Sequence, residues 1–131
     1  MVDALEEARR ILVERGLLVD ARPDSRVTAR VRRGTAKGAI LGTIGTQRPT
    51  KADDTRSDRA VAEVLSRGLF SSLRRGRVWH AIPFEDVREL QDYLDDHLRF
   101  SRRVRWRAPA SGRRGRLYVE RPVRFEVLER R

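Results

Sequence analysis

The sequence predicts an α/β fold: one domain with a mixed β-sheet and about three helices. The 131 residues are the size of one ordinary domain. Three segments place apolar residues three or four positions apart, which is typical of amphipathic helices, and other segments alternate apolar and polar residues, which is typical of strands. Helices and strands follow one another with no repeat and no linker, which favours one α/β domain over residues 1–131.

Residues 3–15 predict the first helix, whose apolar face carries Leu5, Ala8, Ile11 and Leu12. Gly16 is typical of a helix C-terminus. Residues 17–21 follow at once as a short apolar run, and such a run between a glycine and a proline predicts a buried strand.

Residues 25–33 alternate strictly, with Val27, Ala29 and Val31 on one face and Arg26, Thr28, Arg30 and Arg32 on the other. This predicts a half-exposed antiparallel strand. Residues 36–46 contain three glycines and predict a second, bulged strand that completes a hairpin. The spacing of these glycines fits neither a phosphate loop nor a dinucleotide turn. Residues 47–53 contain Pro49 and predict a loop.

In the second half, residues 54–67 predict a helix capped by Asp54, and residues 84–98 predict a third helix. Residues 77–82 predict a strand with a partly buried His80. Residues 99–107 fit either a strand or a continued helix, and residues 108–115 predict a loop. Residues 116–128 predict the strongest strand, with one apolar face from Leu117 to Val127; its Pro122 indicates a bulge or an edge position.

The net charge of +11 is distributed unevenly. Of the 30 basic residues 28 are arginine, and residues 99–131 hold 12 arginines against three glutamates, a net charge of +9. Such a basic C-terminal segment suits phosphate, an anionic surface or an acidic protein partner. The alternative is that the arginine excess only reflects the base composition of the genome.

The best candidates for contact with nucleic acid or another anion lie in this segment: Arg102, Arg103, Arg105, Trp106, Arg107, Arg113, Arg114 and Arg116. Arginine side chains bind phosphates in a forked geometry, and Phe100 or Trp106 could stack on a base. The simpler interpretation is that Phe100, Val104 and Trp106 are core residues and that the arginines form a solvated face.

Several classes of site are excluded by composition. The chain has no cysteine, which excludes disulfides, thiolate metal sites and cysteine nucleophiles. Its two histidines, His80 and His97, predict neither a zinc site nor a catalytic triad. No apolar run approaches the length of a transmembrane helix, and the acidic N-terminus does not resemble a secretory signal. We therefore expect a cytoplasmic protein with no metal, no catalytic residue and no membrane partner.

One helix-strand segment resembles part of a known family. The run Leu5-Glu6-Glu7-Ala8-Arg9-Arg10-Ile11-Leu12, followed by Gly16 and the strand at residues 17–21, is similar to the helix before the fifth strand of class I S-adenosylmethionine-dependent methyltransferases. The later helices and the final strand resemble the C-terminal half of that fold, whose last strand runs antiparallel to the others. The N-terminal half, which holds the cofactor in that family, has no counterpart in this chain, so no cofactor-binding residue is carried over.

The resemblance implies a non-catalytic, methyltransferase-like domain for protein interaction or substrate recognition. One alternative is a nucleic-acid-binding protein that uses the arginine-rich C-terminal segment. Another is one half of a split methyltransferase, which would bind S-adenosylmethionine only with a partner chain. Because the flanking strands of the family are absent, Leu17, Leu18 and Val19 predict an open strand edge at which two copies pair as a homodimer or a second protein chain binds. The alternative is that a helix or the hairpin at residues 27–45 covers this edge within one chain.

Overall fold

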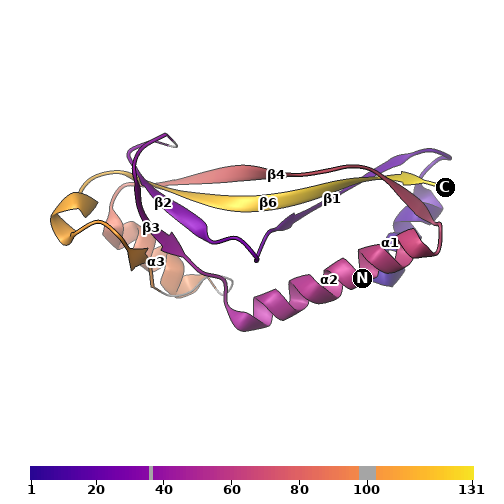
Figure 1. Cartoon of the computed structure of the whole chain (residues 1–131), viewed down its shortest axis with the longest axis horizontal. Coiled ribbons are helices and arrows are strands. Elements are labelled where there is room, and N and C mark those ends of the chain that lie inside the picture. Colours follow the sequence, from indigo (N-terminus) through magenta and orange to yellow (C-terminus); the bar gives the residue numbers. More distant parts are fainter. Residues whose placement is uncertain (36, 98–102) are drawn as a thin grey trace. The chain divides into compact units, whose positions relative to one another are not determined.

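The computed structural model describes residues 1–35, 37–97 and 103–131. Their secondary structure follows the chain as α1 (Val2–Ile11), β1 (Leu17–Pro23), β2 (Ala29–Arg33), β3 (Ile40–Ile44), α2 (Arg48–Ser66), β4 (Phe70–Phe84), α3 (Val87–Asp96), β5 (Arg105–Trp106), the 3-10 helix η1 (Ala110–Arg113) and β6 (Leu117–Arg130) (Figure 1). The predicted α/β class, with three α-helices in the described part of the chain, is confirmed.

The strands form one six-stranded sheet with the order β1-β6-β2-β3-β5, and β4 pairs with β6. The pairs β2–β3, β2–β6 and β3–β5 are antiparallel, so the sheet is antiparallel where we expected a mixed one. The β2–β3 connection explains this in part, because a short turn can join only antiparallel neighbours. Gly34 opens that turn in the left-handed conformation, with a φ of 64°. The register shifts between Val31 and Arg32, which confirms the predicted bulge in the hairpin.

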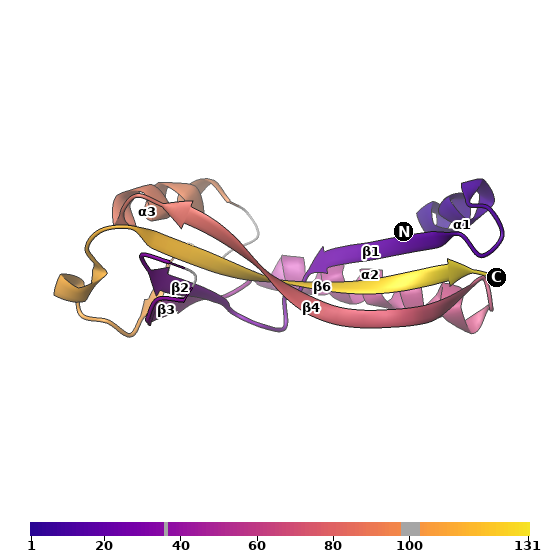
Figure 2. The ribbon, with the colours of Figure 1, turned by 90° about the horizontal axis from the view of Figure 1, so that it is seen from above.

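The domain divides into two compact units, each with its own core. The first unit comprises Met1–Arg22, Ala52–Val78 and Val123–Arg131. In it β1, β6 and the first half of β4 run side by side (Figure 2). The helices α1 and α2 bury apolar side chains against these strands, and the core consists of Leu5, Ala60, Val61, Val64, Phe70 and Leu128.

An ion-pair network crosses the first unit. Asp58 of α2 lies 3.1 Å from a terminal nitrogen of Arg22 on β1 and also accepts a hydrogen bond from Arg124 on β6. Arg22 in turn lies 2.7 Å from the carboxylate of Asp20. Because both arginines are largely buried, this network orients α2 against two different strands in addition to the apolar contacts.

The second unit comprises Pro23–Lys51 and Trp79–Pro122. Its core consists of Ala29, Val31, Leu41, Ile44, Phe84, Leu90, Leu94, Leu117 and Val119. The helix α3 supplies Leu90 and Leu94, both fully buried, and so it packs on the face of the sheet that carries Val31 and Val119. The Asp86 side chain caps this helix by accepting a hydrogen bond from the Glu89 N–H at 2.9 Å.

Two helix boundaries differ from the predictions. The helix α1 ends at Ile11 and not at residue 15, because the chain turns through Arg15, whose φ is 59°, before β1 begins. The helix α2 begins at Arg48, inside the segment predicted as a loop. Pro49 is compatible with this start, because the N–H groups of the first helical turn have no hydrogen-bond partner within the helix and the proline loses only such a group. Asp54 therefore lies within the helix and is buried, so the predicted capping role is wrong.

Three strand predictions also need correction. Strand β4 begins at Phe70 and not at residue 77, and its His80 is exposed. Strand β1 is not buried: Leu17 and Val19 are 56% and 60% exposed, because β1 ends the strand order and only Leu18 on its other face reaches the core.

The remaining correction concerns β6, which is not an edge strand, since it pairs with β1, β2 and β4. Its Pro122 lies two residues after Glu120, which is the last residue of β6 that pairs with β2. The lost N–H of the proline therefore falls where the partner strand changes. The apolar side of β6 also changes along its length: Val119 is buried in one core, whereas Leu128 and not Val127 is fully buried in the other.

Candidate functional site

The strands of the second unit have one apolar face and one polar face. Directly paired residues share a face. The register places Trp106, Gly42, Val31 and Val119 in one row on the core side. The two rows that flank it lie on the opposite side of the sheet. One consists of Arg105, Thr43, Arg30 and Glu120, and the other consists of Ile40, Arg32 and Tyr118. We call the surface formed by Arg30, Arg32, Thr43, Arg105, Tyr118 and Glu120 the polar face.

Two interactions organise the centre of the polar face. The guanidinium carbon of Arg30 lies 3.9 Å from the centroid of the Trp79 ring, which adds an aromatic side chain from β4 to this face. Arg32 donates from Nε to Oε2 of Glu120 at 2.7 Å and from a terminal nitrogen to the carbonyl of Gly38 at 2.9 Å. The single carboxylate of the polar face is therefore buried and neutralised, while Arg30 and Tyr118 stay half-buried.

A groove with a volume of about 460 Å³ adjoins the polar face at β3 and β5. Its lining residues are Thr28, Thr43, Gly45, Arg103, Val104 and Arg105. Thr28 and both arginines are exposed, and Val104 packs against the core. Two hydroxyl donors and two guanidinium groups thus line one open groove, and this is a donor set that suits an oxyanion such as phosphate.

Gly42 makes the position of the groove possible. A β-carbon added at Gly42 would lie 2.8 Å from the carbonyl oxygen of Arg105 and 2.9 Å from the Val104 side chain. Glycine is therefore needed for β5 to approach β3 closely enough to pair. This pairing sets Arg105 opposite Thr43. The sequence predicted that its glycines weaken or bulge this strand, and in the structure Gly42 is the position where the backbones of β3 and β5 come close together.

The charge of the second unit is strongly positive around these residues. The unit holds 17 basic and eight acidic residues, and six of the eight acidic residues lie in residues 85–97, in and just before α3. The rest of the unit has 16 basic residues against Asp24 and Glu120. Both of these carboxylates are buried, and each has an arginine beside it. The positive charge of the chain thus gathers in this unit and away from α3.

The structure brings two of the predicted contact residues, Arg103 and Arg105, together in the groove. Arg107 is exposed, and its backbone N–H donates to the carbonyl of Leu41 at 2.8 Å. Trp106 packs against the core, and the guanidinium carbon of Arg113 lies 4.6 Å from the ring centroid. The simpler interpretation therefore holds for Trp106, whose outer face Arg113 covers.

The other predicted residues are more dispersed. Arg113 donates from Nε to the carbonyl of Ala108 at 2.8 Å, which holds it in the η1 turn. Arg114 is exposed, and Arg116 lies 3.5 Å from the carboxylate of Glu85. Arg102 and Phe100 lie outside the described residues.

Sequence reasoning did not select Thr28, Arg30, Thr43, Trp79 and Tyr118 as site residues. A signal for two of them was present, because the alternation of residues 25–33 places Thr28 and Arg30 on the face opposite Val31. For Thr43, Trp79 and Tyr118 no such signal exists, since their place on the same face depends on the pairing of strands that are distant in sequence.

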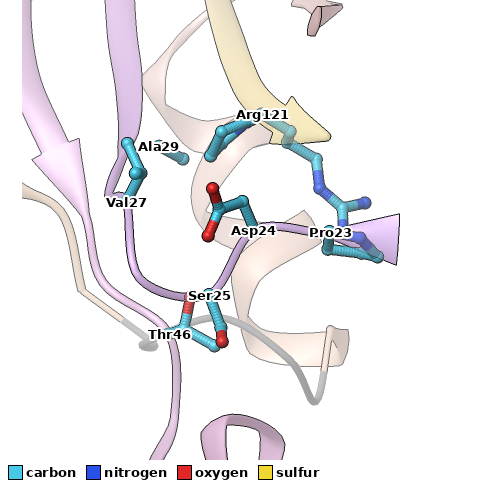
Figure 3. A pocket seen from close by; sticks show the side chains of 8 residues that line it. Pro23, Asp24, Ser25, Val27, Ala29, Thr46 and Arg121 are labelled. Atoms are coloured by element: carbon cyan, nitrogen blue, oxygen red, sulfur yellow. The ribbon is translucent and has the colours of Figure 1, made fainter. Parts of the chain in front are cut away.

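A second pocket in this unit is lined by Pro23, Asp24, Ser25, Val27, Ala29, Thr46, Arg121 and Pro122 (Figure 3). The Asp24 carboxylate points into it and accepts the Arg26 N–H at 3.2 Å, while the Asp24 carbonyl accepts the Val27 N–H, also at 3.2 Å. The cavity measures about 20 Å³, which is room for one water molecule. Asp24 therefore stabilises the turn before β2, and the pocket is too small for a ligand.

Other kinds of site receive no support from the part of the chain that the structure describes. Within residues 1–35, 37–97 and 103–131, no three histidine or carboxylate side chains gather as metal ligands. None of the helices described there has the length and hydropathy needed to cross a membrane. No protein-family model, curated protein or solved structure matches the chain.

Proposed function

We propose that this chain is a non-catalytic interaction domain that binds nucleic acid through the polar face and the adjoining groove of its second unit. The observation that carries the proposal is the groove itself, in which Thr28, Thr43, Arg103 and Arg105 converge beside a sheet face whose one carboxylate is neutralised. The partner class is the one expected from the arginine-rich C-terminal segment, and the structure adds residues of β2 and β3 to the proposed surface.

The chemistry of the surface favours a phosphate backbone over an acidic protein. Guanidinium groups form forked hydrogen bonds to phosphate oxygens, and threonine hydroxyls commonly supplement them in contacts that carry no sequence information. Arg30 and Arg105 lie on one row across neighbouring strands, with Thr43 between them. This arrangement provides repeated cationic positions along a line, which suits a polymer with regularly spaced charges.

The resemblance to methyltransferases enters this proposal only as an alternative origin for an interaction or recognition domain. In the resembled fold only the last strand runs antiparallel, whereas all the strand pairs with a described register are antiparallel here. A split methyltransferase remains a separate hypothesis, which isothermal titration with S-adenosylmethionine tests. We expect no binding by the chain alone, and micromolar affinity would replace the proposal by an enzymatic one.

The test of the proposal is fluorescence anisotropy with a labelled 20-nucleotide oligomer over a salt series. If six phosphates are contacted, the affinity falls about 10³-fold between about 50 and 200 mM salt. The double variant Arg103→Gln/Arg105→Gln should bind more weakly and flatten the logarithmic salt slope by about one per arginine.

The matched control is Arg56→Gln/Arg59→Gln, which removes the same charge from exposed positions of α2 in the first unit. It should keep nearly the full affinity and most of the slope. Absence of binding at low salt, or an equal loss in both double variants, would overturn the proposal. Equal binding to anionic phospholipid vesicles would show a general polyanion surface and would also overturn it.

A further inference from the structure

We infer that the nucleic acid bound by the second unit is single-stranded, with a base placed at the Arg30–Trp79 stack and the backbone in the Thr28/Thr43/Arg103/Arg105 groove. This inference rests on the proposed function and deepens it. Its own observation is that two aromatic residues lie on the polar face: Arg30 stacks on the ring of Trp79, and Tyr118 is directly opposite Arg32.

Trp79 does not belong to the core of the second unit. The core of the second unit takes its β4 side chains from Ile82 and Phe84, whereas Trp79 contacts Arg30 on the opposite, polar side and is only half-buried. A planar guanidinium on an indole ring forms a flat, cationic stack. Bases of single strands bind to such stacks, because every base has a flat π-face and the adjoining phosphate is anionic.

The distance from the groove to this stack suits an extended strand. The groove lies at β3 and β5, and Arg30, which stacks on Trp79, lies on β2. With neighbouring strands about 4.8 Å apart, the two spacings from β5 to β2 give a path of ~10 Å across the face. Thr43 lies between Arg105 and Arg30 along this path, so neighbouring nucleotides of one strand could follow this row of polar side chains.

A duplex would use this surface poorly. Its bases are stacked inside the helix and cannot lie on Trp79, and a protein reads a duplex mainly with a helix, ribbon or arm inserted in a groove. The polar face presents its side chains from the surface of a sheet, and the acidic helix α3 packs on the opposite face of that sheet. The shape of this surface therefore favours an unpaired strand.

The experiment compares Trp79→Leu with the wild-type chain by anisotropy, using a single-stranded 20-mer and the duplex of the same sequence. We expect the wild type to prefer the single strand. Loss of one base stack should weaken single-strand binding between about fivefold and 100-fold and leave the weaker duplex binding unchanged. The matched control is His80→Leu, which changes the adjacent, exposed residue of the same strand.

A second measurement keeps the inference testable if Trp79→Leu unfolds the chain. The variant Trp106→Phe leaves Trp79 as the only tryptophan of the protein. Its fluorescence should be quenched by the single strand and not by the duplex. Equal or tighter duplex binding, or no quenching by a bound single strand, would overturn this inference and leave the proposed function standing. Absence of binding to both nucleic acids would overturn the proposed function as well.

Discussion

The carboxylate of Glu120 lies 2.7 Å from Nε of Arg32, across two neighbouring strands, with side chains only 10% and 18% exposed. The pair neutralises the one acidic residue of the polar face and orients Arg32 toward the carbonyl of Gly38. A charge pair at this depth is costly to break, because the remaining partner stays in a poorly hydrated place without compensation. The same pair thus stabilises the second unit and shapes the charge of its proposed binding surface.

Removal of the Glu120 carboxylate should destabilise the chain. We expect Glu120→Ala to lower the free energy of unfolding by about 3 kcal/mol, since it leaves a buried guanidinium without its partner. Urea denaturation measures the change. The control is Glu85→Ala, which breaks the exposed pair with Arg116 and should cost less than about 1 kcal/mol. Similar losses in the two variants would show that the Arg32–Glu120 pair contributes no more than a surface pair.

The glycine at position 42 should be required for the groove. Gly42→Ala places a methyl group against the Arg105 carbonyl and Val104, so β5 must move away from β3. We expect loss of stability of about 1–3 kcal/mol, typical of overpacking, together with weaker oligonucleotide binding. Gly112→Ala is the control, because it lies outside the groove and a β-carbon added there would meet its nearest neighbours at 3.5 to 3.7 Å, which is ordinary van der Waals contact. Unchanged binding by Gly42→Ala would mean that the position of Arg105 does not matter for affinity.

The homodimer predicted from the sequence stays a prediction, and the structure makes its test sharper. Strand β1 ends the strand order, and its exposed side carries Leu17 and Val19. A two-fold pairing centred on Val19 would bury this apolar row against its own copy. Light scattering should then report about twice the chain mass of 15.2 kDa at micromolar concentration.

Val19→Lys should restore the monomer mass, because a lysine blocks pairing at an open edge. The control is Val13→Lys, which makes the same substitution at an exposed apolar residue outside β1. Circular dichroism should show both variants folded. A monomer mass for the unaltered chain at all accessible concentrations would exclude pairing at this edge.

The ion pair in α1 predicts a small titration effect. The Arg10 side chain donates to the Glu7 carboxylate at 2.7 and 2.8 Å and holds the pKa of Glu7 below its ordinary value. Since the folded-state pKa is the lower one, the pair stabilises the helix above the unfolded pKa of Glu7, and this stabilisation is lost as the pH falls through the folded pKa. A carbon-detected NMR titration should show the lowered pKa, and Arg10→Gln should return it to the usual range. An unchanged Glu7 titration in that variant would assign the shift to another cause.

Local pattern was sufficient for the parts of the fold that depend on neighbours in sequence. The spacing of Leu90 and Leu94 predicts the buried side of α3, and the alternation around Val31 predicts which β2 side chains enter the core, because helical and extended backbones impose fixed periods. The same alternation places Arg30 on the outer face. The excess of arginine in residues 99–131 is also visible in the sequence, whereas the joining of most of that segment with the basic residues of 23–51 in one unit is not.

Tertiary structure alone decided what those faces meet. Leu17-Leu18-Val19 has the composition of a buried strand, yet only Leu18 is covered, because burial depends on which strand or helix lies beside it. Pairing of β3 with β5 brings Arg105 beside Thr43, and the contact across the sheet brings Trp79 beneath Arg30, although 49 residues separate the latter two. Contacts between distant segments arise from chain closure and side-chain packing, which leave no periodic signal in the sequence.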